Sequence, residues 1–232
     1  MSEAVVATRG LTRILRDPLP VTLVEDVDLE VRRGEFVAIT GPSGSGKSSL
    51  LYLLGLLDTP TRGSVLLEGK DTSRLSPREL TRLRLTKLGF VFQFHFLLPE
   101  FTVLENLMIP MRKLGRLAEA GMRERARTLL ADLAMESEAK KTPDQLSGGQ
   151  RQRAAVARAL ANEPLVVLAD EPTGNLDSKN AHNVFDIFRR LAEERGQTVI
   201  TVTHDPQLAA RTHRQLHIVD GRLVPAGAVA GA

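Results

Sequence analysis

The sequence contains no cysteine and no long apolar run. Without cysteine the chain can form no disulfide, no thiolate metal site and no cysteine nucleophile, which suits a reducing compartment. The most apolar stretch, residues 50–57, is far shorter than the roughly 20 residues that cross a bilayer. The first nine residues lack the basic segment and apolar run of a secretory signal, so we expect no export. Any role at a membrane would therefore come through partner proteins.

The net charge of the chain is also small. Lys and Arg number 31 against 28 Asp and Glu, giving a net charge of +3 that is interleaved along most of the chain. This pattern gives little support to nucleic-acid binding, and we expect no nucleic-acid partner. One local exception is the stretch of residues 74–87, where five basic residues accompany one acid, Glu79. That stretch is either a solvated helix face or a contact for phosphate or lipid headgroups.

At 232 residues and 42% hydrophobic content, the chain can bury the core of one large α/β domain or of two closely packed lobes. A capping serine, a proline and an acid three positions on predict a helix that begins after Ser76. Turn residues and β-branched runs predict the other early elements. We expect strands over residues 21–24, 27–31, 36–40, 64–67 and 89–93, and a helix over residues 47–57.

The second half of the chain alternates between helical and strand patterns. Between about residues 99 and 160 the apolar spacing is helical, which predicts a helical lobe inserted in the sheet. Two apolar runs, residues 165–169 and 198–202, flank a helix predicted over residues 178–194, as in parallel strands joined by a crossover helix. Residues 225–232 have neither polar anchors nor periodicity, and we expect a flexible tail.

A glycine-rich stretch follows the predicted strand 36–40 and has the full pattern of a phosphate-binding loop, G-P-S-G-S-G-K-S. Its glycines let backbone N–H groups turn toward phosphates, Lys47 can reach the terminal phosphates, and the Ser48 hydroxyl can ligate magnesium. A purely structural glycine turn is the alternative. The expected nucleotide contacts are Gly41, Pro42, Ser43, Gly44, Ser45, Gly46, Lys47, Ser48 and Ser49.

Two acids end the apolar run of residues 165–169. Carboxylates at the carboxyl end of a buried strand suit magnesium and water chemistry, because ligands bind at that edge of α/β sheets. We expect Asp170 to hold magnesium, directly or through water, and Glu171 to polarise an attacking water. Taken alone, the two acids could instead cap a helix.

The third motif is Leu-Ser-Gly-Gly-Gln at residues 146–150. Ser147 can cap a helix whose first N–H groups, left open by Gly148 and Gly149, can approach a γ-phosphate. The motif resembles the signature of the ATP-binding cassette (ABC) family. Because the three motifs occur in the family's order, the chain resembles that family over residues 11–223.

The resemblance implies an α/β fold: a P-loop NTPase cassette with a RecA-like mixed sheet, an N-terminal antiparallel β subdomain and an inserted helical signature subdomain. It would form a single ATPase domain over residues 1–224, with the helical subdomain at about residues 94–160. It also implies ATP and Mg²⁺ as cofactors and a homodimer of cassettes placed head to tail. Each ATP would then lie between one copy's phosphate loop and the other copy's Ser147, Gly148, Gly149 and Gln150.

Three further residues are assigned roles only because of their places relative to the three family motifs. Gln93 matches the glutamine that senses magnesium and water, Asp177 lies in the loop that crosses the dimer interface, and His204 matches the γ-phosphate histidine. Without those motifs they would be an ordinary polar residue, a helix cap and a loop histidine. The resemblance thus implies that Glu171, His204 and Gln93 are catalytic, and that Ser48, Gln93 and Asp170 hold the metal.

One position departs from the family pattern. Cassettes usually stack an aromatic ring on adenine from an early position, which here corresponds to Leu15. Leucine can pack on a purine but lacks the aromatic stacking energy, so we expect weaker or less base-selective nucleotide binding.

Residues 170–178 resemble the group of lipoprotein-releasing, macrolide-export and cell-division ATPases, and residues 92–107 and 203–209 resemble the lipoprotein-releasing members. The implied function is to drive lipoprotein release from a bacterial inner membrane toward the outer membrane. The chain would lie on the cytoplasmic face, bound peripherally to a permease pair of integral membrane subunits, and would meet the cargo only through them. A macrolide-type or cell-division motor is the alternative, followed by a soluble ABC protein of DNA repair or translation.

Apolar residues that follow Gln93 are candidates for the partner contact. They would suit a helix that lies in a groove, although about half of them could instead belong to the core of the helical lobe. The candidates are Phe94, Phe96, Leu97, Leu98 and Phe101.

Overall fold

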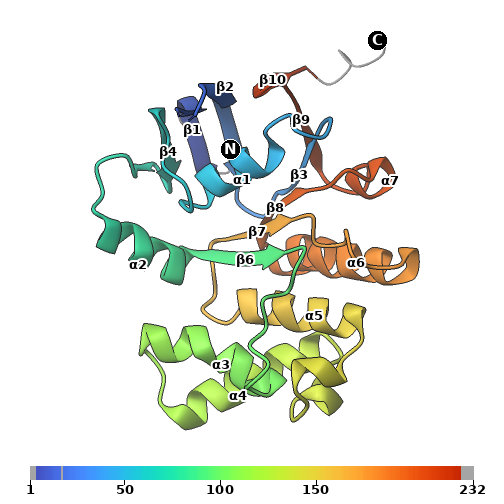
Figure 1. Ribbon diagram of the computed structural model, residues 1–232. Helices are drawn as coiled ribbons and strands as arrows, with labels where there is room; N and C mark the ends of the chain where they lie inside the picture. Colours follow the sequence, from blue (N-terminus) through green and yellow to red (C-terminus); the bar gives the residue numbers. More distant parts are fainter. Residues whose placement is uncertain (1–3, 17, 226–232) are drawn as a thin grey trace.

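The computed structural model describes residues 4–16 and 18–225 and contains two sheets (Figure 1). The first sheet is antiparallel, in the order β2-β1-β4-β5. Its strands are β1 (Ala4–Leu15), β2 (Val21–Arg32), β4 (Arg62–Leu67) and β5 (Lys70–Asp71). The second sheet has the order β10-β9-β3-β8-β7-β6, in which all neighbours are parallel except β9 and β10. Its strands are β3 (Phe36–Thr40), β6 (Leu88–Phe92), β7 (Val166–Asp170), β8 (Thr198–Val202), β9 (Arg214–Val219) and β10 (Arg222–Val224).

Helices cover both faces of the second sheet. They are α1 (Lys47–Leu54), α2 (Pro77–Lys87), α3 (Val103–Leu114), α4 (Glu119–Asp132), α5 (Gly148–Ala159), α6 (Ser178–Arg195) and α7 (Pro206–Ala209), with short 3₁₀ turns η1 (Glu136–Glu138) and η2 (Pro143–Gln145). Figure 1 shows α3, α4 and α5 gathered at the end of the molecule opposite the first sheet. This is the helical lobe that the apolar spacing predicts; its definition as a subdomain of residues 94–160 stays a prediction.

Alternation along the central strands divides the core in two. In β7, Val166 and Leu168 pack into the cluster that contains α1, whereas Val167 and Ala169 pack into the cluster of α3, α4, α5 and α6. Successive side chains of a strand point to opposite faces, so one apolar strand supplies both clusters. As a result, α1 lies on one face of the sheet and α5 on the other.

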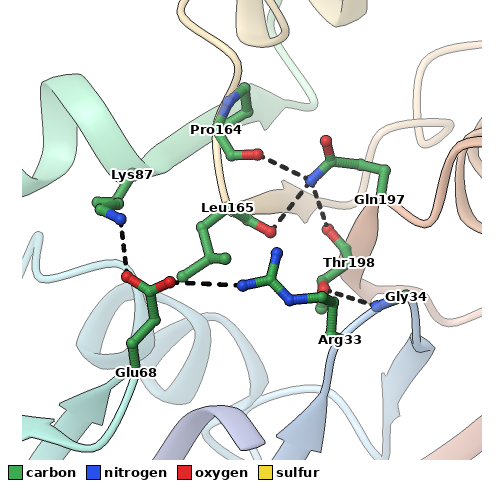
Figure 2. A network of polar contacts seen from close by, with 8 residues as sticks. All are labelled: Arg33, Gly34, Glu68, Lys87, Pro164, Leu165, Gln197 and Thr198. Carbon is green, nitrogen blue, oxygen red and sulfur yellow. Dashed lines mark hydrogen bonds and ion pairs between the residues drawn. The ribbon is translucent and has the colours of Figure 1, made fainter. Parts of the chain in front are cut away.

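A polar network ties together the amino ends of the central strands (Figure 2). The Gln197 amide donates to the carbonyl oxygens of Pro164, Leu165 and Thr198, each at 3.2 Å. Nearby, Glu68 accepts from Lys87 at 2.7 Å, and this hydrogen bond lowers the pKa of the Glu68 carboxyl. The network satisfies backbone carbonyl groups at the amino ends of these strands. The predicted functional residues cluster at the opposite, carboxyl ends.

Several predicted boundaries are wrong. Residues 21–24 and 27–31 form one strand, β2, because the chain passes Asp26 in a left-handed conformation (φ 50°) without leaving the sheet. The sequence pattern set no bounds for β1, and it missed β5, β9 and β10 as strands. Helix α1 ends at Leu54 and not at residue 57, because Gly55 caps it. The expected flexible tail lies almost entirely outside the described residues.

The capped helix predicted after Ser76 is confirmed as α2, with both hydrogen bonds of the capping box. This helix buries none of its residues, which both interpretations of the basic stretch allow. Within the described ranges, no helix is long and apolar enough to cross a membrane.

Candidate functional site

The glycine-rich loop connects β3 to α1, and its backbone approaches neighbouring strands closely. A Cβ on Gly41 would lie 2.1 Å from the carbonyl oxygen of Ile218, and a Cβ on Gly46 would lie 2.1 Å from that of Leu23. Both glycines also have positive φ angles, of 144° and 100°. Among the described residues, no side chain caps the N-terminus of α1, so its first N–H groups can bind an anion.

The polar groups inside this loop fit a bound phosphate. Lys47 is buried, and its Nζ donates to the carbonyl oxygens of Gly41 at 3.0 Å and Pro42 at 2.7 Å. The buried Ser45 hydroxyl has no hydrogen-bond partner within residues 4–16 and 18–225. A buried polar group of this kind costs free energy unless it is paired. The loop therefore carries a cation at the start of α1, where phosphate oxygens would bind, whereas the unsatisfied Ser45 hydroxyl is enclosed by protein.

Asp170, the last residue of β7, accepts hydrogen bonds from two residues of α1. Ser48 Oγ donates to Oδ1 at 2.8 Å, and the Tyr52 hydroxyl donates to Oδ2 at 2.7 Å. Burial, together with the hydrogen bond to Asp170 and its charge, raises the pKa of Tyr52 to about 12, so the phenol remains a donor near neutral pH. No motif assigns Tyr52 a role, although its spacing of four residues from Ser48 places both on one helix face.

Glu171 and His204 come together because β7 and β8 are parallel neighbours. Glu171 has a φ of 42°, and its backbone N–H donates to Val202 O at 3.2 Å. His204 Nδ1 lies 3.5 Å from Glu171 Oε2. The side chain of Glu171 is 29% exposed and that of His204 is 66% exposed, so this pair can reach a ligand or a second copy.

Gln93 follows the next strand, β6, and packs on the loop after Glu171. Its Nε2 donates to Asn175 Oδ1 at 3.2 Å, and Asn175 Nδ2 donates back to Gln93 O at 3.3 Å. A Cβ on Gly174 would lie 2.8 Å from Gln93 Nε2. Four consecutive strands, β3, β8, β7 and β6, thus present the phosphate loop, His204, the acids and Gln93 at one edge of the sheet, where α/β proteins bind ligands.

The structure does not bring the 146–150 motif to the phosphate loop. Ser147 caps α5 in a capping box: its Oγ accepts from Gln150 N at 3.3 Å, and Gln150 Oε1 accepts from Ser147 N at 2.8 Å. A Cβ on Gly149 would lie 2.4 Å from Asn180 Oδ1. Asp177 accepts from Asn180, caps α6, and has its pKa lowered by these hydrogen bonds. The motif and the 175–177 loop therefore form one unit, on the helices that pack against the sheet face opposite α1.

The donor set suits magnesium bound together with a nucleotide. Within the described ranges there is no cluster of three or more His, Asp or Glu that could hold a metal. The Ser48 hydroxyl and the Asp170 carboxylate are hard oxygen donors. Mg²⁺ is commonly held by one or two protein oxygens, waters and the substrate's phosphates. The fold and this site define a nucleotide-binding ATPase of the P-loop class.

Comparison with known proteins extends this assignment. The family model described as ABC transporter matches residues 24–174. The chain is 53% identical to the lipoprotein-releasing system ATP-binding protein LolD 1 of Chlorobium chlorochromatii, over 87% of this chain and 82% of that protein. It is 52% identical to LolD of Aquifex aeolicus, over 87% and 89% of the two chains, and 47% identical to LolD of Bordetella avium, over 96% and 97%.

Solved structures show the same fold. A dimeric ATP-binding cassette in a post-hydrolysis state with bound ADP and Pi superposes with a TM-score of 0.87 at 40% identity, over 98% of this chain and all of that one. CbiO1 from Clostridium perfringens gives a TM-score of 0.88 at 26% identity, over 97% and 88%. The chain therefore belongs to the ABC transporter family, as an ATPase of the LolD type. It hydrolyses ATP with Mg²⁺, and the predicted cassette fold is confirmed.

Leu15 lies at the end of β1, opposite Val21. It is 40% exposed, and Val21 and Leu19 nearby in the sequence are also exposed. Because Leu23 on β2 approaches Gly46 closely, this apolar strand end lies next to the phosphate loop. The position suits a contact with adenine, which stays a prediction.

The Leu15→Tyr variant tests that contact. Aromatic stacking contributes about 0.5–1.5 kcal/mol, so we expect this variant to bind ATP roughly twofold to twelvefold more tightly than the wild type, with a smaller gain for GTP. Leu117→Tyr, which adds a ring at an exposed position between α3 and α4, should leave both affinities unchanged. Titration of the three proteins with each nucleotide measures the effect; equal ATP affinity in Leu15→Tyr and the wild type would disprove the contact.

Proposed function

We propose that two copies of this chain associate head to tail and hydrolyse ATP between them. The single observation that carries this proposal is the separation of Ser147 from Lys47: their helices, α5 and α1, cover opposite faces of one sheet. One copy therefore offers a phosphate loop and a signature motif that do not meet each other. The similar dimeric cassette with bound ADP and Pi supports the arrangement.

We propose the following roles at each shared site. Lys47 and the loop N–H groups bind the phosphates, and Ser48 and Asp170, with Gln93, hold Mg²⁺, which when bound neutralises phosphate charge. Glu171 orients the attacking water and accepts its proton. His204, beside Glu171, and Ser147 of the other copy stabilise the charge that develops on the γ-phosphate.

A second surface suits a membrane-embedded partner. A groove of about 480 Å³ lies between α2, β6, α3 and the end of α5, and Phe90, Phe92 and Pro110 are among its lining residues. The ring of Phe92 stacks on that of Phe90, and Phe96 packs edge-on against Phe92 at 5.5 Å. Phe94 and Phe96 are each 63% exposed. Aromatic residues therefore continue from the groove onto the surface, as in a site that binds an apolar helix face.

Hydrogen bonds from Asn106 and Arg158 hold this surface in place. Asn106 is fully buried, and its side chain bonds the backbone of Leu98, Phe101 and Thr102. Arg158 on α5 donates to the carbonyl oxygens of His95 and Phe96. The segment after Gln93 is thus tied to the helix that begins at the signature motif. Of the predicted contact residues, Leu97 packs on the helical core and Phe94, Phe96 and Leu98 are exposed.

We propose that the partners are two integral membrane subunits and that the complex releases lipoproteins from the bacterial inner membrane toward the outer membrane. The LolD names of relatives at 47–53% identity support this function. The chain would lie peripherally on the cytoplasmic face and contact the cargo only indirectly. Capture of the tagged chain from detergent-solubilised host membranes tests this: two membrane subunits that release lipoprotein from proteoliposomes with ATP are expected. A single exporter-like or cell-division partner would overturn the proposed cargo.

Substitution of the exposed rings tests the docking surface. We expect Phe94→Ser with Phe96→Ser to reduce capture of the membrane subunits by roughly tenfold or more, because buried aromatic anchors dominate interface energies. ATP binding by the isolated subunit should be unchanged, since neither ring contacts the phosphate loop. Leu117→Ser, at an exposed leucine between α3 and α4, is the matched control. Full capture by the double variant would place the partner elsewhere.

A further inference from the structure

Tyr52 is the only tyrosine of the chain, and it lies beside Asp170, one of the residues proposed to hold the metal. Its hydroxyl donates to Asp170 Oδ2 at 2.7 Å from a half-buried position on α1. Ser48, one helical turn earlier, donates to the other oxygen, Oδ1, at 2.8 Å. Residues four apart face the same way on a helix, so α1 holds both oxygens of one carboxylate.

The two donors are not equivalent. Ser48 is itself a proposed magnesium ligand, and its hydroxyl oxygen would serve the metal as well as Asp170. Tyr52 has no second partner among its side-chain hydrogen bonds in the described residues, so its hydroxyl serves Asp170 alone. Outer-shell donors of this kind fix the orientation of a metal-binding carboxylate.

We propose that Tyr52 is a positioning residue, whose hydroxyl holds the Asp170 carboxylate in the orientation in which it binds Mg²⁺ with the nucleotide. The inference concerns the hydrolysis site within one copy. It rests on the magnesium-binding role proposed for Asp170, but not on the membrane partners or the cargo.

The Tyr52→Phe variant removes the hydroxyl and keeps the ring. Loss of an outer-shell partner typically weakens metal binding by 10- to 100-fold, so we expect about tenfold weaker Mn²⁺ binding to the ADP-loaded variant, followed by electron paramagnetic resonance. The Mg²⁺ concentration for half-maximal hydrolysis should rise by a similar factor. ATP binding in the presence of EDTA should not change, which separates an effect on the metal from an effect on the nucleotide pocket.

A double-mutant cycle with Asp170→Asn shows whether Tyr52 acts through the carboxylate. Tyr52→Phe should add no further loss of Mn²⁺ affinity in the Asp170→Asn background, because the group it positions is absent. Thermal melting of each variant confirms that the fold is retained. Unchanged Mn²⁺ affinity in Tyr52→Phe, or an equal loss with and without Asp170→Asn, would overturn the proposal.

Discussion

Glutamine in place of Glu171 should reduce ATP hydrolysis by about 10³-fold, the contribution typical of a general base. Glu171 lies at the carboxyl end of β7, held by a backbone hydrogen bond to Val202, with His204 at 3.5 Å. An amide keeps the shape of the side chain but cannot accept a proton from water. ATP binding should survive, because the phosphate loop is untouched, and the ATP-bound dimer should accumulate.

The matched control is Glu163→Gln. Glu163 also has a positive φ, of 54°, and it pairs with Arg125 at a distance from the site. Its substitution should leave single-turnover hydrolysis unchanged, which separates loss of the base from loss of a glutamate in a left-handed turn. Hydrolysis by Glu171→Gln within a few fold of the wild type would remove Glu171 from the role of base.

The parts of the site that could be predicted from the sequence are those whose functional groups come from a few consecutive residues. The phosphate loop needs glycines at 41 and 46 because backbone from β2 and β9 lies only 2.1 Å from a Cβ there, and this constraint is visible as a local pattern. Asp170 and Glu171 end a buried strand, and parallel pairing explains why they meet His204.

Contacts between distant segments could not be predicted from local pattern. The sequence gives no sign that Tyr52 meets Asp170, 118 residues away, or that Asn180 fills the space beside Gly149. The bounds of β1 were not predicted, because Gly10 interrupts the strand in a left-handed conformation and its register shifts between Thr8 and Leu11. Polar residues in β9 likewise hide a strand that packs beside β3.

The second large effect concerns the junction between two copies. We expect bound ATP to bring the phosphate loop of one copy close to the signature motif of the other copy. The two segments of a single copy should stay apart. Ser147→Arg should abolish that approach, because arginine cannot form the capping box with Gln150 and its bulk lies where the γ-phosphate would bind. Each single copy should still bind ATP through its own Lys47.

Because the chain has no cysteine, one engineered cysteine per copy gives an unambiguous crosslink. In the Glu171→Gln background, Ser43→Cys protein mixed with Gln145→Cys protein and treated with a short bis-maleimide should form a crosslinked heterodimer when ATP is present. The crosslink should be absent without ATP and absent when both copies carry Ser147→Arg. An ATP-independent crosslink, or none under conditions in which both proteins bind ATP, would contradict the shared site.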